Sequence, residues 1–402
     1  MTGAITKTPA LAERPERLAR LRNLKMARSA HAYVRGSTAK FYDWLEASQG
    51  RLPTGPSVWI CGDCHLGNLG PLADANGEVA IQIRDLDQTV IGNPAHDLVR
   101  LGLSLASAAR GSDLPGVTTA RILEGLVEGY EAALAEDFET EIVHPPVIEA
   151  VLQRAVHRKW KHLAEERLDD VSPAIPLGKH FWSPSLAERR ELEDLFAGDQ
   201  VRDLITLLKG RRKRDRIEVL DAAYWVKGCS SLGNLRYAVL AGLVRKKEGL
   251  RDICLIDLKE AVRAAAPRDP KAEMPRDNAE RIVAGARALS PNLGERMAAA
   301  RLMGKPVVVR ELMPQDLKIE IDQLSADEAT AVARALARVV GDAHGRQMDA
   351  ATRKRWLADL ARARSTTLDA PSWLWSSVVE LIALHEAAYL EHCRRYALAE
   401  AA

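Results

Sequence analysis

One loop in the first quarter of the chain carries a carboxylate, an imidazole and an amide close together. Residues 61–68 read Cys-Gly-Asp-Cys-His-Leu-Gly-Asn and follow a short β-type run at 57–61. Asp63, with His65 beside it, could accept the proton of an acceptor hydroxyl, and Asn68 could turn back along the loop to bind a metal ion. A short loop after a strand would hold these side chains near one another.

A second acidic group ends the strand after this loop. Residues 81–87 read Ile-Gln-Ile-Arg-Asp-Leu-Asp, and the turn sequence at 74–77 predicts a hairpin that brings Asp85 beside Asn68. Mg²⁺ prefers oxygen ligands and is usually held by one or two carboxylates together with substrate phosphates. The pattern therefore predicts a Mg²⁺ site made by Asn68 and Asp85, with Asp87 as a further ligand.

The interval Asp-x-x-x-x-Asn, followed by a strand that ends in Asp, is also the arrangement of the catalytic loop and metal strand in protein kinases. Asp63 or Asp85 taken singly would be an ordinary residue at the end of a strand. Their joint occurrence with Asn68 and a hairpin favours the transfer of a phosphoryl group from Mg²⁺-bound ATP.

The cysteines of the loop allow two other interpretations. Cys61-x-x-Cys64-His65 matches the attachment motif of c-type haem, and a cysteine pair is half of a zinc site. Haem attachment of that type takes place outside the cytoplasm, and residues 1–22 lack the apolar core of an export signal. No second Cys/His pair stands at ligand spacing. We interpret both cysteines as small, half-buried side chains.

The elements around the loop are mainly helical, with one sheet-rich part. Ser325 is a typical N-cap for the last helical stretch. Periodicity predicts helices at 16–50, 97–110, 118–168, 186–208, 278–290 and from 325 onward, and strands at 222–227, 235–244, 253–259 and 307–312. This order predicts an α+β protein in which a small antiparallel-sheet lobe at 215–315 is inserted between two parts of a helix-rich lobe, at 1–210 and 316–402.

The loop and metal strand resemble known enzymes over a wider stretch. Residues 62–68 and 83–87 are similar to the catalytic loop and metal strand of aminoglycoside and choline kinase-like enzymes. Residues 93–98 resemble the segment in which an Asp, here Asp97, tethers that loop. More closely, the chain resembles the bacterial family called domain of unknown function 2252. The matching blocks are 26–36, 61–68, 227–233, 258–261, 309–312 and 343–346.

This resemblance implies a two-lobed, protein-kinase-like fold that is circularly permuted. Kinases place their Gly-rich loop and nucleotide-binding lysine before the catalytic loop, whereas here Asp63 precedes Lys259 by nearly two hundred residues. The chain before Asp63 is too short to hold a nucleotide lobe as well. The sequence also departs from these enzymes at Cys61, where His is frequent, and at Ser230, where Gly is frequent. The class of acceptor therefore stays open.

The sheet-rich part would bind the nucleotide. Small residues between two strands would let backbone N–H groups approach phosphate oxygens. Lys259 at the end of the third strand could reach the α- and β-phosphates, with Glu280 or Glu260 as its ion-pair partner, and the backbone of Glu311 to Met313 could bind adenine. The small residues of the predicted phosphate loop are Gly228, Ser230, Ser231 and Gly233.

Composition and net charge limit the classes of binding partner that we expect. The formal net charge is only +2, from 57 basic and 55 acidic side chains, which argues against a nucleic-acid or membrane-surface protein. No apolar run approaches the roughly 18 residues of a membrane-spanning helix, so we expect a cytoplasmic protein. The basic run 209–216 is interpreted as a surface linker, and by resemblance Arg35 would line the acceptor pocket.

Three functions are consistent with these patterns. The first is an ATP- and Mg²⁺-dependent phosphotransferase that acts on a hydroxyl acceptor, most simply a small molecule. The second keeps the same fold but transfers AMP. The third is a pseudokinase-like nucleotide-binding protein that regulates or recruits a partner, against which the presence of Asp63, Asn68, Asp85 and Lys259 argues.

Overall fold

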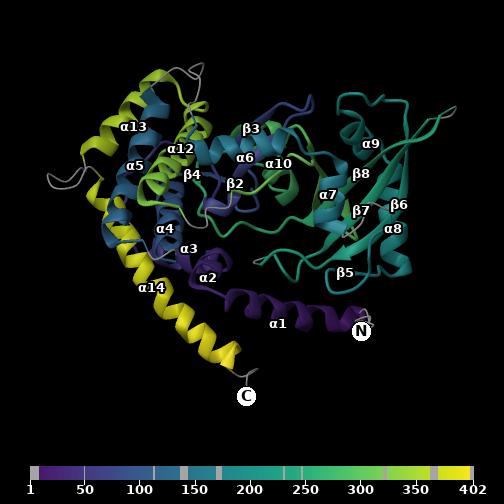
Figure 1. The fold of residues 1–402 in the computed structure, drawn as a ribbon, viewed down its shortest axis with the longest axis horizontal. Helices are drawn as coiled ribbons and strands as arrows, with labels where there is room; N and C mark the ends of the chain where they lie inside the picture. The colour runs from purple at the N-terminus through teal and green to yellow at the C-terminus, as the bar shows by residue number, and fades with distance from the viewer. Residues whose placement is uncertain are drawn as a thin grey trace.

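Helices occupy one side of the molecule and an antiparallel sheet the other, as the computed structural model shows (Figure 1). It describes residues 9–398, except 49, 112–113, 136–143, 169–173, 230, 246–247, 320–323 and 363–369. The predicted α+β class is confirmed. No helix among these residues is long and apolar enough to cross a membrane.

The sheet has six strands in the order β5-β6-β7-β8-β10-β9, with every neighbouring pair antiparallel. Its central strands are buried on both faces, since alternate residues face two separate apolar clusters. The strands are β5 (Phe181–Trp182), β6 (Arg216–Trp225), β7 (Arg236–Arg245), β8 (Gly249–Glu260), β9 (Met297–Leu302) and β10 (Lys305–Leu312). The strands predicted near 222, 235, 253 and 307 are thus confirmed, and two more join them.

Helices cover the sheet and fill the other side of the molecule. On the sheet side are α7 (Trp160–Leu168), α8 (Leu186–Ala197) and α9 (Asp199–Thr206). On the helical side are α2 (Ala30–Gly36), α3 (Thr38–Ala47), α4 (Ala95–Gly111), α5 (Gly116–Ala135), α6 (Pro146–Val156), α12 (Ala326–Gly345), α13 (Ala350–Arg362) and α14 (Ser372–Tyr396). Ser325 caps α12 as predicted, because its hydroxyl accepts from the N–H of Glu328.

Between the two sides lie short elements that carry the candidate chemistry. Strand β1 (Val58–Ile60) pairs with β4 (Val90–Gly92), and β2 (Leu69–Ala73) pairs with β3 (Val79–Ile83), which confirms the predicted hairpin. Helices α10 (Asn278–Leu289) and α11 (Pro291–Gly294) connect β8 to β9. Residues that come early and late in the sequence therefore meet in this middle layer.

The N-terminal helix links the two sides. The predicted single helix 16–50 is instead three helices, because Ser29 caps α2 with its hydroxyl and Ser37 separates α2 from α3. The first of the three, α1 (Arg14–Met26), runs from α2 to a position under the sheet (Figure 1). Leu18 of α1 belongs to the apolar cluster of the sheet side.

Arg296 fastens the β2–β3 hairpin to the end of β10. Its guanidinium donates from Nε to the carbonyl of Ala73 at 2.8 Å and from Nη1 to that of Glu311 at 2.9 Å. It also pairs with Asp316 at 3.0 Å, and its side chain is 1% exposed. A charge this deeply buried is stable only with all of these partners present.

Replacing Arg296 is therefore expected to destabilise the protein strongly. Arg296→Ala should lower the free energy of unfolding by about 3–5 kcal/mol, because it removes the ion-pair partner of the largely buried Asp316 carboxylate and the donor to two carbonyls. Arg301→Ala is the matched control, since Arg301 also pairs with an aspartate at 3.0 Å but is 66% exposed. It should cost no more than about 1 kcal/mol. Urea unfolding of both variants measures the difference, and equal losses would contradict the assignment.

Candidate functional site

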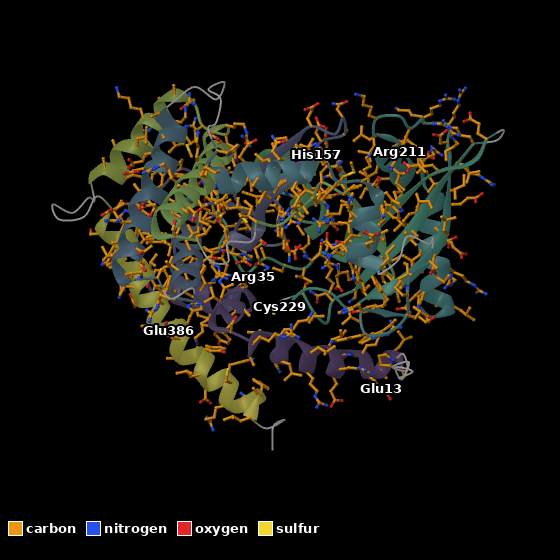
Figure 2. The ribbon with its side chains drawn as sticks, in the orientation of Figure 1. Glu13, Arg35, His157, Arg211, Cys229 and Glu386 are labelled. Carbon is orange, nitrogen blue, oxygen red and sulfur yellow. The ribbon has the colours of Figure 1, made fainter. Side chains whose placement is uncertain are left out.

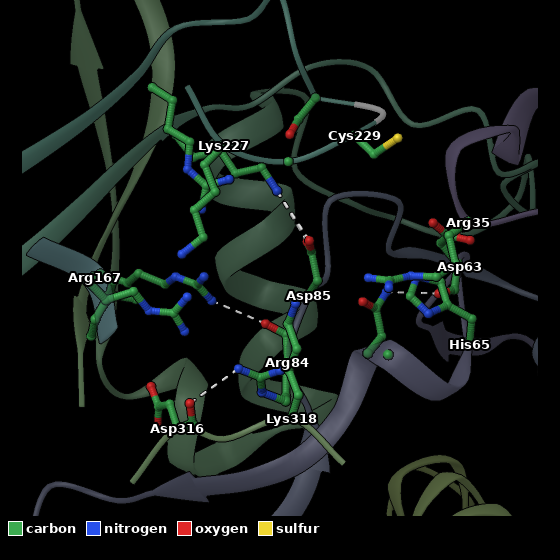
Figure 3. A pocket seen from close by; sticks show the side chains of 18 of the residues that line it. Arg35, Asp63, His65, Arg84, Asp85, Arg167, Lys227, Cys229, Asp316 and Lys318 are labelled. Carbon is green, nitrogen blue, oxygen red and sulfur yellow. Dashed lines mark hydrogen bonds and ion pairs between the residues drawn. The ribbon is translucent and has the colours of Figure 1, made fainter. Parts of the chain in front are cut away.

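A cavity of 480 Å³ lies between the helical and sheet sides (Figure 3). It is lined by α1, α2, the loop 61–68 and the β2–β3 hairpin from one part of the chain, and by the β6–β7 turn, β8 and β10 from another. Basic side chains far outnumber the acidic ones, which are Asp63, Asp85 and Asp316. The basic ones are Lys25, Arg28, Arg35, Arg84, Arg167, Lys227, Arg236, Lys259, Arg310 and Lys318. Such a lining suits an anionic ligand.

Asp97 holds the loop 61–68 in place, as predicted. Its two carboxylate oxygens accept hydrogen bonds from the backbone N–H groups of Cys61 at 2.7 Å and Gly62 at 2.9 Å. His344 lies 3.2 Å from the same carboxylate and bonds Tyr130 through its other ring nitrogen. Asp97 and His344 are both fully buried, so these hydrogen bonds hold the start of the loop firmly in place.

The loop also needs glycine at its second position. Gly62 has φ +74°, and a Cβ there would lie 2.2 Å from the carbonyl oxygen of Gln88. Glycine adopts this conformation without strain, and a residue with a Cβ would not tolerate this approach. The sharp turn at Gly62 lets the next side chain, Asp63, project into the cavity.

Asp63 is held in one orientation by two donors. Arg100, which is fully buried, donates from Nε to Oδ1 at 2.9 Å, and Thr38 donates from its hydroxyl to Oδ2 at 3.0 Å. Asn68 donates from its amide nitrogen to the backbone carbonyl of Asp63 at 3.0 Å. That bond commits the nitrogen of Asn68 to the loop, so its carbonyl oxygen is the end that could serve as a metal ligand.

The hairpin brings Asp85 to the same cavity. The register pairs Leu69 with Ile83, and the N–H of Arg84 donates to the carbonyl of Asn68 at 2.7 Å. Asp85 and Asn68 both line the cavity, which confirms the predicted proximity of these two segments. The Asp85 side chain is 45% exposed, so that its carboxylate can reach a ligand.

Lys259 pairs with both acids of the metal strand. Its Nζ lies 3.3 Å from Asp85 and also contacts Asp87. Burial alone would raise the pKa of Asp85, but the charges of Lys259 and Arg310 lower it well below its usual value. Burial and the charge of Asp85 raise the pKa of Asp87 to about 6. Burial opposes the charge of Lys259, yet the two carboxylates outweigh it and raise the lysine pKa.

These residues fit a Mg²⁺ ion that arrives with a polyphosphate. In the described part of the chain, no group of three or more His, Cys, Asp or Glu side chains is arranged to hold a metal. Of the predicted donors, Asp85 and the carbonyl oxygen of Asn68 belong to residues that line the cavity, whereas Asp87 does not line it and is reached through Lys259. Since Mg²⁺ typically takes one or two carboxylates and completes its shell with phosphate oxygens and water, this donor set is sufficient only with a phosphate ligand present.

Three further basic residues near Lys259 also line the cavity. Asp257, fully buried on β8, receives two hydrogen bonds from Arg236, at 2.9 and 2.6 Å, and pairs with Arg310 at 3.2 Å. Lys227 lies over the ring of Trp225 at 3.8 Å and has no ion-pair partner among the described residues. Burial, together with nearby arginines, holds the pKa of Lys227 well below its usual value. An anion in the cavity would favour the charged form of Lys227 and raise its pKa again.

The predicted phosphate loop is only partly at the cavity. It forms the turn between β6 and β7, and Gly228 and Ser231 line the cavity while Gly233 does not. Ser230 lies outside the described residues. Gly228 has φ +100°, and its carbonyl accepts from Lys25 of α1 at 3.0 Å. The turn is therefore attached to the N-terminal helix.

The two acidic partners predicted for Lys259 do not pair with it, and the predicted adenine contact stays a prediction. Glu280 is exposed on α10 and does not pair with Lys259, whose partners are the two aspartates; Glu260 pairs instead with Lys305 at 3.0 Å. Of the segment Glu311 to Met313, whose backbone was predicted to bind adenine, Glu311 does not line the cavity; its carbonyl accepts from Arg296 and its side chain pairs with Arg211. Met313 does line the cavity, but its N–H already donates to Asp316 at 3.3 Å.

His65 lines the cavity as a neutral imidazole. It is buried, and its Nδ1 has no hydrogen-bond partner among the described residues. Burial lowers the pKa of His65 to about 3, against the opposing effect of Asp63. At neutral pH it therefore cannot donate a proton as an imidazolium, and it serves the site as an uncharged neighbour of Asp63.

The charge state of His65 makes stability depend on pH. The pKa of His65 in the folded protein lies below the ordinary value of about 6.5. The unfolded chain therefore binds this proton more readily, so the free energy of unfolding is highest above about pH 6.5 and decreases as the pH falls below it. Between pH 7 and pH 5 the loss should be about 2 kcal/mol larger in the unmodified protein than in His65→Asn. Urea unfolding at both values tests this, with His157→Asn on the surface as the matched control. Equal pH dependence in His65→Asn and the unmodified protein would contradict the assignment.

Comparison with known proteins places the chain in a family. Neither the curated proteins nor the solved structures contain a significant match to it. The family described as "uncharacterized protein conserved in bacteria (DUF2252)" matches residues 14–395, nearly the whole chain. The predicted family resemblance is confirmed by this match, and the chain belongs to the bacterial family DUF2252.

Proposed function

We propose that this protein is an ATP- and Mg²⁺-dependent phosphotransferase that acts on a hydroxyl group of a small molecule. The observation that carries the proposal is that Asp63, Asn68, Asp85 and Lys259 line one cavity, although Lys259 is distant in sequence from the other three. These are the residue types that a kinase uses to orient an acceptor, bind metal and bind phosphates.

The order of the elements supports a protein-kinase-like fold with its two lobes exchanged in the chain. The sheet side contains, in sequence, a glycine-containing turn between β6 and β7, Lys259 on β8, helix α10, and then β9 and β10. Kinases have a Gly-rich loop, a lysine on their third strand and a helix in that order. The loop 61–68 and the strand that ends at Asp85 precede this unit instead of following it.

The charges of the cavity support a polyphosphate beside Lys259. Lys227, Arg236 and Lys259 lie at the sheet side of the cavity, close to the β6–β7 turn. The negative charges of a triphosphate would supply the acidic partner that Lys227 lacks, and would compete with the aspartates for Arg236 and Lys259. Asp85, Asp87 and Asn68 would hold Mg²⁺, which would neutralise charge on the phosphates.

The chemical step needs only one proton acceptor from the protein. The acceptor hydroxyl would lie against Asp63, whose carboxylate takes its proton while the hydroxyl oxygen forms a bond to the γ-phosphorus. The bond from that phosphorus to the β-phosphate oxygen breaks, and ADP leaves. Arg100 and Thr38 keep the carboxylate in position, so that the rate gain comes from orientation.

Nucleotide binding is the direct test. ATP with Mg²⁺ should bind in calorimetry, and Mg²⁺ alone should not, because the carboxylates need phosphate to complete the metal shell. Lys259→Ala should weaken ATP binding about tenfold or more, since it removes a charge-assisted contact. Lys305→Ala is the matched control, because Lys305 lies on neighbouring β10 and is 51% exposed outside the cavity. The proposal fails if the unmodified protein shows no affinity for ATP at millimolar concentration, with or without Mg²⁺.

The role of Asp63 separates an enzyme from a nucleotide-binding regulator. Asp63→Asn should keep ATP binding, because the amide fills the same space, and should lower turnover about 10²–10⁴-fold by removing the proton acceptor. ATP consumption with a metabolite mixture gives the readout, and thermal unfolding checks that the variant folds. Unchanged turnover would exclude the assigned role. Release of pyrophosphate instead of ADP would indicate AMP transfer.

A further inference from the structure

Three cations of the α1–α2 wall of the cavity have no role in the proposed binding of ATP. Lys25 of α1, Arg28 in the turn after it, and Arg35 of α2 line the cavity, where Lys25 reaches the β6–β7 turn and Arg35 lies beside the loop that carries Asp63. None of them forms an ion pair with a carboxylate of the described residues. Figure 3 shows Arg35 beside Asp63 and His65, while Arg84, Arg167 and Lys227 lie on the far side of Asp85.

The guanidinium of Arg35 packs against Gly67 in the loop that carries Asp63. A Cβ at Gly67 would lie 2.9 Å from Cζ of Arg35 and 3.0 Å from its Nη2, so the guanidinium occupies the space above this glycine. The Nε of Arg35 is buried without a hydrogen-bond partner among the described residues. An arginine held in this way keeps its planar donor group ready for an oxyanion.

Lys25 and Arg28 complete the cluster from the side of α1. The charges of Lys25, Arg35 and Arg28 all act on the thiol of Cys229, at the tip of the β6–β7 turn. Figure 2 shows Arg35 and Cys229 near each other between the two sides of the molecule. Lys25 donates to the carbonyl of Gly228 at 3.0 Å, and this contact leaves its positive charge uncompensated. We call Lys25, Arg28 and Arg35 the α1–α2 cluster.

The cations on the sheet side differ because acids accompany most of them. Lys259 pairs with Asp85 and Asp87, and Arg236 and Arg310 share Asp257. Lys227 is the exception among them, whereas all three cations of the α1–α2 cluster lack an acidic partner among the described residues, and Arg35 of this cluster lies beside the loop of Asp63, where the acceptor would bind. A neutral acceptor would leave three cations close together in a cavity from which water has been displaced, which is unfavourable.

We infer that the acceptor is itself a phosphate ester with a free hydroxyl group. Its phosphate would bind the α1–α2 cluster, and this contact would present the hydroxyl to Asp63. Three cations match the double negative charge of a phosphomonoester better than the single charge of a carboxylate, and Arg binds such groups through two parallel hydrogen bonds. The inference rests on the proposed function, which places ATP beside Lys259.

The test uses two titrations of the intact protein. First, a non-hydrolysable ATP analogue with Mg²⁺ is bound to saturation, which fills the sheet end of the cavity. Then glycerol 3-phosphate, glycerate and glycerol are titrated in turn, by calorimetry. Glycerol 3-phosphate should bind most tightly, glycerate more weakly and glycerol not measurably. Arg35→Gln and Lys25→Gln should each weaken glycerol 3-phosphate binding about tenfold or more, and Arg28→Gln less, because Arg28 is exposed.

Arg17→Gln is the matched control. Arg17 lies on the same helix as Lys25, loses the same charge and stands outside the cavity, near the ring of Trp182. It should leave glycerol 3-phosphate binding unchanged. The inference is overturned if the loaded protein binds glycerol 3-phosphate no better than glycerol, or if Arg35→Gln and Arg17→Gln have the same effect. If the ATP analogue itself does not bind, the proposed function fails and the acceptor class fails with it.

Discussion

The geometry of the cavity depends on the hydrogen bonds that one buried carboxylate accepts. Asp97 binds two consecutive N–H groups at the start of the loop 61–68, and His344 and Tyr130 hold Asp97 in turn. The loop is too short to fix itself. Without Asp97, the turn at Gly62 would be free to relax, and Asp63 would lose its position relative to Asn68 and Asp85. The buried chain from Tyr130 to Asp97 thus supports groups that stand at the surface of the cavity.

Electrostatic balance explains the arrangement around this loop. Arg236 and Lys259 on the sheet side are stabilised by aspartates, and Lys227 lies over the ring of Trp225. Lys259 satisfies the acids of the metal strand while no ligand is present, and it would have to share them with a metal ion once phosphates bind. A charged ligand in the cavity would therefore exchange these internal ion pairs for its own contacts.

The sequence was most informative where chemistry depends on local spacing. Asp63, Asn68 and Asp85 lie on a loop and a hairpin, whose turn residues can be recognised without knowing the rest of the fold, and Asp97 was identified by resemblance. Strand β9 was missed because its Ala-rich sequence has little strand propensity. Arg236 and Arg310 were missed because they reach Asp257 across neighbouring strands, and that register depends on tertiary pairing. The sequence analysis also predicted an ion pair between Glu280 and Lys259. Lys259 pairs with Asp85 and Asp87 instead, which likewise depends on tertiary contacts.

Helix α1 is anchored on both sides of the cavity. At its start, Arg14 forms a buried ion pair with Glu188 at 2.7 Å, and at its end the carbonyls of Asn23 and Ala27 accept from His392 and Tyr389 of α14. The two halves of the molecule cannot swing apart as rigid bodies while both attachments persist. A rigid-body separation of the two halves would therefore require α1 to detach at one end or to bend at the turn after Met26. The contacts at the two ends of the N-terminal helix thus limit how far the helical and sheet sides can separate.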